Sequence, residues 1–274
     1  MNPRTGSLEL IHRAPTKRTR KPALLFVHGA YVGAWCWDVH FLRYLADCGF
    51  PSYALSLRGH GASGCDREFS MLGIDDYVDD VERIVAILGE VPVLIGHSMG
   101  GLVVARLLGR SAASDSYALG AVLMAPVPMT GLTPAVLGLA MHAPMLLLEM
   151  NQMQLGQARF KELTHIRRAL FSPQLEEARI RSYFSQMQHE AQRALLEMSM
   201  LHLSAFPPKP QSPLLVLGAE NDGFFGRELA GATARGLGAA CEIFPSMAHA
   251  MMLEPEWRVV ADRIAQWADG LVKA

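Results

Sequence analysis

The sequence predicts an α/β protein with a mainly parallel, doubly wound sheet and an inserted helical cap. Short apolar runs bounded by turn residues recur along the chain, and segments with apolar residues at helical spacing alternate with them. This alternation stops between residues 129 and 209, where the pattern favours helices alone. We therefore expect an α/β core formed by residues 1–128 and 210–274, with the cap at 129–209.

The core elements are predicted in order along the chain. Apolar runs favour strands at 8–12, 23–27, 52–57, 91–95, 119–125, 214–217 and 241–244. The later runs are short and apolar throughout, which is typical of parallel strands that are buried on both faces. Helical spacing predicts helices at 38–48, 74–88, 101–108 and 256–271, and Gly49 follows the first of them where a C-cap glycine belongs.

Three or four helical segments are predicted in the cap, at 134–153, 158–170 and 174–203, and a break within the last of them is left open. Eight of the 15 methionines fall in the cap. Because methionine is flexible and polarisable, a lid rich in it suits an adaptable apolar pocket. We predict that Met129, Met145 and Met150 contact the substrate; the alternative is that such side chains only pack the core of the cap.

Bulk properties disfavour several classes of partner. With a net charge of −1 and a pI near 6.8, nothing favours nucleic acid or an anionic membrane surface. The longest apolar stretch, 135–148, is too short to span a bilayer, so we expect no stable membrane insertion. Four widely spaced cysteines predict neither a disulfide framework nor a zinc site. The first residues lack the apolar segment of a signal peptide, which predicts a cytoplasmic protein.

Four acidic residues crowd the start of the helix predicted at 74–88: Asp75, Asp76, Asp79 and Asp80. Such a group could hold a metal ion. However, a helix N-terminus favours acidic side chains by itself, because its peptide dipoles present positive charge there. We therefore interpret these aspartates as structural and expect no metal site.

Residues 96–100, Gly-His-Ser-Met-Gly, are the most informative stretch of the chain. They follow a strand pattern and precede a helical one, which is the context in which G-x-S-x-G forms a nucleophile elbow. The turn is crowded, so residues without bulk are needed on either side of the serine, and here these are Gly96 and Gly100. The hydroxyl then stands exposed above the helix N-terminus. Ser98 is the predicted nucleophile.

A serine needs a base to remove its proton, and the base needs an acid to orient it. Among ten histidines, His249 alone lies in a loop between a late strand and the final helix, at the sheet edge that also carries the elbow. His28 and His60 lie in glycine-rich loops, where structural hydrogen bonds are expected. The acid should follow the strand at 214–217, where Glu220 and Asp222 are both candidates.

Three blocks of the sequence resemble the α/β-hydrolase superfamily: residues 28–37, the elbow, and the late pair Asp222 and His249. The first block is similar to plant methylesterases of the salicylate-binding-protein and hydroxynitrile-lyase group. Residues 57–63 resemble bacterial lysophospholipase-like and monoglyceride-lipase-like esterases. The resemblance implies an α/β-hydrolase fold, and it favours Asp222 over Glu220 as the acid.

The resemblance also assigns roles to residues of the first block. In such proteins two backbone amides bind the oxyanion, which here implies the amides of Ala30 and Met99. Tyr31 follows the oxyanion loop and is predicted to reach the pocket, whereas Trp37 is predicted to anchor that loop by packing. One position departs from the pattern, because the esterase relatives usually have an acid where Ser56 stands.

These residues predict a serine hydrolase that cleaves a carboxylic ester of a small to medium lipophilic substrate through a Ser-His-Asp triad and an acyl-enzyme, with no cofactor. Fold does not fix function, so hydrolysis of carbon–carbon bonds or thioesters and perhydrolysis stay open on the same triad. A hydroxynitrile-lyase-type reaction would use a cap lysine, for which Lys161 and Lys209 are the candidates. The alternative from another class is a ligand sensor of the same fold with slow turnover.

Overall fold

A seven-stranded sheet forms the centre of the structure, a computed structural model that describes residues 7–110, 116–156, 163–200 and 211–273. The strands are β1 (Glu9–Arg13), β2 (Leu24–Val27), β3 (Ser52–Ser56), β4 (Val93–His97), β5 (Gly120–Met124), β6 (Leu214–Ala219) and β7 (Ala240–Phe244). They are ordered β1-β3-β2-β4-β5-β6-β7. Only β1 of these runs antiparallel to its neighbour. The prediction of a mainly parallel sheet is confirmed.

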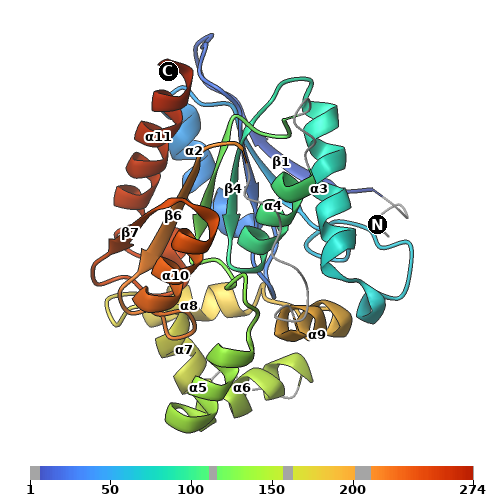
Figure 1. The fold of residues 1–274 in the computed structure, drawn as a ribbon, viewed down its shortest axis with the longest axis vertical. Coiled ribbons are helices and arrows are strands. Elements are labelled where there is room, and N and C mark those ends of the chain that lie inside the picture. Colours follow the sequence, from blue (N-terminus) through green and yellow to red (C-terminus); the bar gives the residue numbers. More distant parts are fainter. Residues whose placement is uncertain (1–6, 111–115, 157–162, 201–210, 274) are drawn as a thin grey trace.

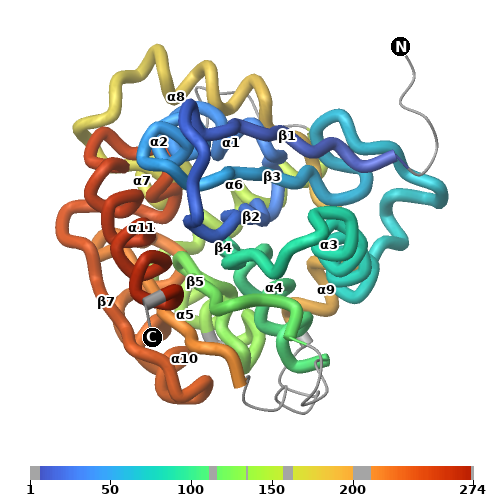
Figure 2. Tube along the Cα trace, turned by 90° about the horizontal axis from the view of Figure 1, so that it is seen from above, coloured from blue at the N-terminus to red at the C-terminus, as the bar shows by residue number. Residues whose placement is uncertain are grey.

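The central strands are apolar because helices cover both of their faces. Every residue of β2, β4 and β5 is buried. One face packs against α1 (Trp35–Asp38), α2 (Phe41–Asp47) and α11 (Trp257–Lys273). The other packs against α3 (Ile74–Leu88), α4 (Met99–Arg110) and α10 (Arg227–Leu237). Figure 2 shows α2 and α11 on one side of the row of strands and α3 and α4 on the other.

Among the described residues between β5 and β6 there are five helices, which gather at one end of the molecule (Figure 1). These cap helices are α5 (Thr133–His142), α6 (Pro144–Gln154), α7 (Thr164–Leu170), α8 (Glu177–Phe184) and α9 (Gln192–Met200). Side chains from α6 and α7 form a small apolar core of their own, with Leu146 and Ile166 among its buried residues. The helices cover the end of the sheet at which β4 leads into α4.

The first cap segment is broken where its periodicity predicts a single helix. The helix expected at 134–153 is two helices, because Ala143, which precedes Pro144, leaves the helical region with φ −144° and ψ 55°. The break left open in the segment at 174–203 is present, because the described part of it forms two helices, α8 and α9. Its last residues, 201–203, lie outside the described residues. Part of the helix expected at 158–170 and the predicted boundary at 209 fall outside the described residues. In the described ranges, no helix combines the length and the apolar character that crossing a bilayer requires.

Candidate active site

Ser98 occupies a strained turn between β4 and α4. Its φ is +53°, a left-handed conformation that non-glycine residues rarely adopt. The turn is held from both sides, because the amide of Ser98 donates to Met124 O at 2.9 Å and its carbonyl accepts from Val127 N at 3.1 Å. The flanking glycines have no room for a side chain. A Cβ on Gly96 would lie 2.3 Å from the carbonyl oxygen of Gly100, and one on Gly100 would lie 2.4 Å from that of Val27.

His249 and Asp222 meet at the carboxyl edge of the sheet. His249 Nδ1 lies 2.8 Å from Asp222 Oδ2, and both side chains are buried. The other carboxylate oxygen accepts the backbone N–H groups of Phe224 at 2.8 Å and Phe225 at 2.9 Å. Since a carboxylate fixed in this way accepts the Nδ1 proton, Nε2 is the imidazole nitrogen left for proton transfer.

The structure separates the two candidate acids. Glu220 pairs with Arg227 at 2.7 Å and accepts the amide of Ser246 at 3.1 Å. Its carboxylate is half-exposed and does not contact His249. Asp222 is therefore the acid that the fold brings to the imidazole.

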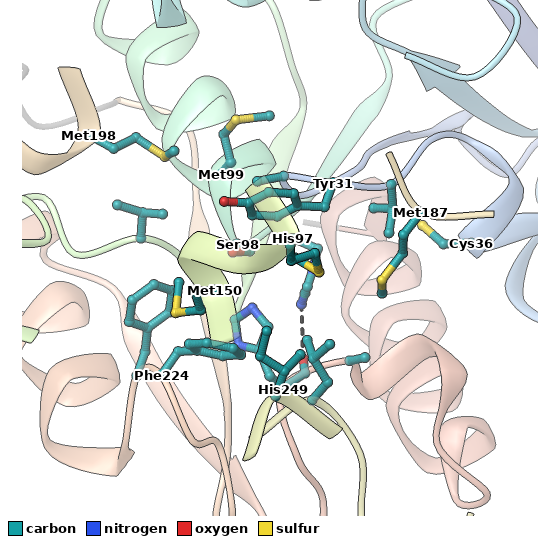
Figure 3. A pocket seen from close by; sticks show the side chains of 18 of the residues that line it. Tyr31, Cys36, His97, Ser98, Met99, Met150, Met187, Met198, Phe224 and His249 are labelled. Carbon is teal, nitrogen blue, oxygen red and sulfur yellow. Dashed lines mark hydrogen bonds between the residues drawn. The ribbon is translucent and has the colours of Figure 1, made fainter. Parts of the chain in front are cut away.

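His97, which precedes the predicted nucleophile, points away from Ser98 and toward the backbone of His249. Its Nε2 lies 2.9 Å from His249 O, the contact drawn as a dashed line in Figure 3. Burial, together with the neighbouring His249, holds the pKa of His97 well below its ordinary value. A neutral ring with its proton on Nε2 thus donates to the carbonyl of His249. The turn that carries Ser98 and the loop that carries His249 are joined by this hydrogen bond.

The loop after β2 passes directly against Ser98. A Cβ on Gly29 would lie 3.0 Å from Ser98 Cβ and 2.9 Å from His97 Nδ1, so only glycine fits there. Buried His28 fixes the loop, because its Nε2 accepts the amide of Leu57 at 3.0 Å and its Nδ1 lies 2.7 Å from Gly29 O. The predicted oxyanion donor Ala30 follows Gly29, and Met99 is the first residue of α4, where backbone N–H groups have no acceptor within the helix.

Ser56 stands where the esterase relatives usually have an acid, and here a carboxylate on another strand contacts it. Its hydroxyl donates to Glu9 Oε2 on β1 at 2.6 Å and accepts the amide of Ala34 at 2.8 Å. Glu9 also accepts the amide of Ala62 at 3.0 Å. Sequence reasoning missed Glu9, because only the antiparallel pairing of β1 with β3 brings it opposite Ser56.

An apolar cavity lies over Ser98 and His249, between the sheet edge and the cap helices (Figure 3). Its cavity volume is about 120 Å³. Neither a carboxylate nor a Lys or Arg side chain is among the described residues that line it. Six methionines do: Met99, Met150, Met153, Met187, Met198 and Met252.

Of the four residues predicted to contact the substrate, the structure places two in the cavity lining and two elsewhere. Tyr31 and Met150 line the cavity. Met129 is buried on the α3 and α4 side of the sheet and is absent from the cavity lining. Met145 lies on the outer side of α6, where 48% of its surface is exposed. The cap lysines considered for a lyase, Lys161 and Lys209, lie outside the described residues.

Arginine side chains from other elements form ion pairs with the aspartates at the start of α3. Arg110 pairs with Asp79 at 2.6 Å and with Asp75 at 3.2 Å, and Arg58 pairs with Asp80 at 2.7 Å. Within the part of the chain that the structure describes, no three His, Cys, Asp or Glu side chains are grouped so that they could hold a metal ion. These aspartates therefore serve ion pairs and the helix N-terminus.

A strained serine turn, a His–Asp pair and an apolar cavity at the carboxyl edge of a parallel sheet form one site. A sequence model of the alpha/beta hydrolase family matches residues 24–263. The chain belongs to this family. The described α/β-hydrolase fold explains the match, because the matched region runs from the first residue of β2 into α11.

Curated relatives of this alpha/beta hydrolase match part of its sequence. Methyl jasmonate esterase 1 of Vitis vinifera is 34% identical over 93 residues, which is 33% of this chain and 35% of the relative. Methylesterase 18 of Arabidopsis thaliana is 34% identical over 82 residues, which is 28% of this chain and 29% of the relative. The chain thus matches only about a third of the length of these relatives.

Solved structures resemble the alpha/beta hydrolase along nearly its whole length. An esterase from Exiguobacterium antarcticum superimposes with a TM-score of 0.76 at 14% identity, covering 96% of this chain and 95% of the other. A monoacylglycerol lipase from Paleococcus ferrophilus gives 0.64 at 20% identity, covering 97% of this chain and 99% of the other. At such identities the likeness establishes the shared fold.

Proposed function

We propose that this protein is a serine esterase that hydrolyses carboxylic esters of small to medium, uncharged lipophilic substrates. The observation that carries the proposal is the buried hydrogen bond between His249 and Asp222, in the same cavity as a serine on a left-handed turn. The plant methylesterase relatives support the same reaction class.

In the proposed reaction, His249 Nε2 removes the hydroxyl proton of Ser98 as its oxygen attacks the acyl carbonyl. Asp222 holds the Nδ1 proton and stabilises the imidazolium that forms. The negative charge on the carbonyl oxygen is bound by the amides of Ala30 and Met99, and each such donor contributes on the order of 3 kcal/mol to transition-state stabilisation. The imidazolium then protonates the leaving alcohol, and water activated by the same histidine releases the acid.

The cavity supports an uncharged substrate of limited size. An ionised group would lose its hydration there without gaining a charged partner from the described lining. The cavity volume, about 120 Å³, is slightly smaller than that of a cavity known to hold benzene, about 150 Å³. A short acyl or alkyl group fits as the site stands, and longer groups require the flexible methionines to move.

The test is hydrolysis of p-nitrophenyl esters from acetate to palmitate. We expect activity to peak at a short chain length, and Ser98→Ala to reduce kcat by a factor on the order of 10⁴ to 10⁶. Ser70→Ala, which removes an exposed hydroxyl in a 3-10 turn, should leave kcat unchanged. Full activity in Ser98→Ala would contradict the proposal.

The same series separates the alternatives. Folded protein that is inactive on every ester, but turns over a thioester or a β-diketone, would move the assignment to another hydrolysis on the same residues. Ligand-dependent partner binding without turnover would instead indicate a sensor.

A further inference from the structure

The C-terminus of α7 is hydrogen-bonded to both loops that carry the His–Asp pair. Ala169 O accepts the amides of Gly223 at 3.3 Å and His249 at 3.4 Å, and Leu170 O accepts the amide of Ala250 at 2.9 Å. The last carbonyl groups of a helix have no N–H partner within the helix, so here they accept hydrogen bonds from loops of the core. A cap helix thus fixes the backbone of the residues beside Asp222 and of His249 itself.

The contact with the Asp222 loop is close enough to require glycine. A Cβ on Gly223 would lie 2.5 Å from Cα and Cβ of Ala169. Such an approach of two backbones leaves no room for the helix to shift against the loop, because protein interiors are packed without free space. The position of α7 and that of the His–Asp pair are therefore coupled.

Glu254, a residue of the core, makes a further contact with the segment that follows α7. Its side chain is buried, with 1% exposed, and its Oε1 accepts the amide of Ser172 at 2.7 Å, two residues beyond the end of α7. Burial raises the pKa of Glu254, while hydrogen bonds from Ser172 and from the backbone of Ala248 act in the opposite direction. One carboxylate thus links the cap to the residue that precedes His249.

We propose that Glu254 is a positioning residue for His249: by tying the loop of residues 246–253 to Ser172 of the cap, it holds the imidazole in line with Ser98. This inference rests on the proposed function, in which His249 moves the proton. Displacing a reacting group by about 1 Å can cost about 10²-fold in rate, so an anchor that never touches substrate still governs kcat.

The test compares Glu254→Ala with Asp80→Ala. Asp80 is an equally buried carboxylate on α3 that accepts a backbone amide, that of Arg58, but the loop that contains Arg58 does not carry His249. Both variants should lower the melting temperature. We expect Glu254→Ala to lower kcat about 10- to 100-fold with KM changed less than about twofold, and Asp80→Ala to keep kcat within about twofold. Equal kcat in the two variants would overturn the proposal.

Glu254→Gln covers the case in which the alanine variant fails to fold. Its amide oxygen still accepts one N–H group, so a kcat between those of the parent and of a variant without the anchor is expected. A kcat equal to that of the parent would show that a carboxylate is not needed there and would overturn the assignment.

A second readout does not depend on ester hydrolysis. In protein with ¹⁵N-labelled histidine, the Nδ1 proton that His249 shares with Asp222 should give a downfield resonance, identified by its loss in His249→Asn. We expect Glu254→Gln to shift or broaden it and Asp80→Ala to leave it in place. An unchanged resonance would overturn the positioning role. Activity retained in Ser98→Ala would overturn only the proposed function.

Discussion

Asp222 uses its two carboxylate oxygens for different tasks. One accepts from His249, and the other accepts two backbone amides of its own loop. In Asp222→Asn, the amide nitrogen can take the place of one of these acceptors, and an N–H group there would force the imidazole into the wrong tautomer. We expect kcat to fall by about 10⁴, as in serine proteases with this change, with little effect on KM.

The matched variant is Glu220→Gln, two residues away on the same loop. Because Glu220 pairs with Arg227 at the surface, its loss should change kcat less than about threefold, in the range expected for surface substitutions. Steady-state kinetics on one ester compare the two variants. A larger effect at Glu220 than at Asp222 would reverse the assignment of the acid.

The glycines of the elbow are required by space rather than by flexibility. In Gly100→Ala, the new Cβ would lie 2.4 Å from Val27 O and 2.5 Å from His28 O, so the end of β2 would have to move. We expect a loss of at least about 2 kcal/mol in the free energy of unfolding. Gly138→Ala in α5 has open space around the new Cβ and should gain about 0.5–1 kcal/mol. Urea unfolding measures both, and a stable Gly100→Ala would contradict the packing argument.

At the scale of elements, the sequence predicted helices best where one face is apolar and the other polar. Helix α3 begins and ends where periodicity places it, because its apolar side meets the sheet and Gly89 ends it in the left-handed conformation. Helices α5 and α6 carry apolar residues on all sides, so periodicity could show neither their break nor which side faces the cavity. For this reason Met145 and Met150 looked alike in the sequence, although the structure puts them on opposite sides of α6.

That pair supplies a prediction about substrate size. Met150→Ala removes a side chain from the cavity wall and should raise the ratio of octanoate to butyrate hydrolysis about tenfold, since each methylene that gains an apolar contact contributes about 0.8 kcal/mol. Met145→Ala, on the exposed side of the same helix, should leave the ratio unchanged. The ratio of kcat/KM for the two esters measures this. Equal shifts in both variants would mean that α6 acts through stability and not through the cavity wall.

At the scale of the whole molecule, the cap is joined to the core at a second place, beside the loop after β2. The amide of Gln188 donates to Tyr31 O at 2.9 Å, and buried Glu190 lies 3.0 Å from His60 Nε2 and accepts from Tyr77 at 2.7 Å. His60 and Glu190 are 130 positions apart, so no local pattern could predict their contact. The strands and the elbow follow from short apolar runs and from the glycines, whereas the joints between cap and core depend on tertiary packing.

His28 lies in this same region and makes stability depend on pH. Burial, followed by the nearby His60, lowers the pKa of His28 from 6.5 to about 3. Because the unfolded chain takes up this proton at a higher pH than the folded protein does, the stability that neutral His28 contributes is complete above about pH 6.5 and declines as pH falls toward 3. The decline approaches about 1.4 kcal/mol per pH unit, or about 2 kcal/mol between pH 7 and pH 5.

Urea unfolding at pH 7 and pH 5, for the parent and for His28→Asn, isolates this contribution. Asp80 and Glu254, whose pKa values are raised by burial, titrate in both proteins and cancel in the comparison. We expect the variant to be less stable at both pH values, because the amide of Leu57 loses its imidazole acceptor. Its loss of stability on acidification should nevertheless be smaller than that of the parent by about 2 kcal/mol. Equal losses in the two proteins would mean that His28 is protonated in the folded state, and the hydrogen bonds that hold the loop after β2 would then need a different assignment.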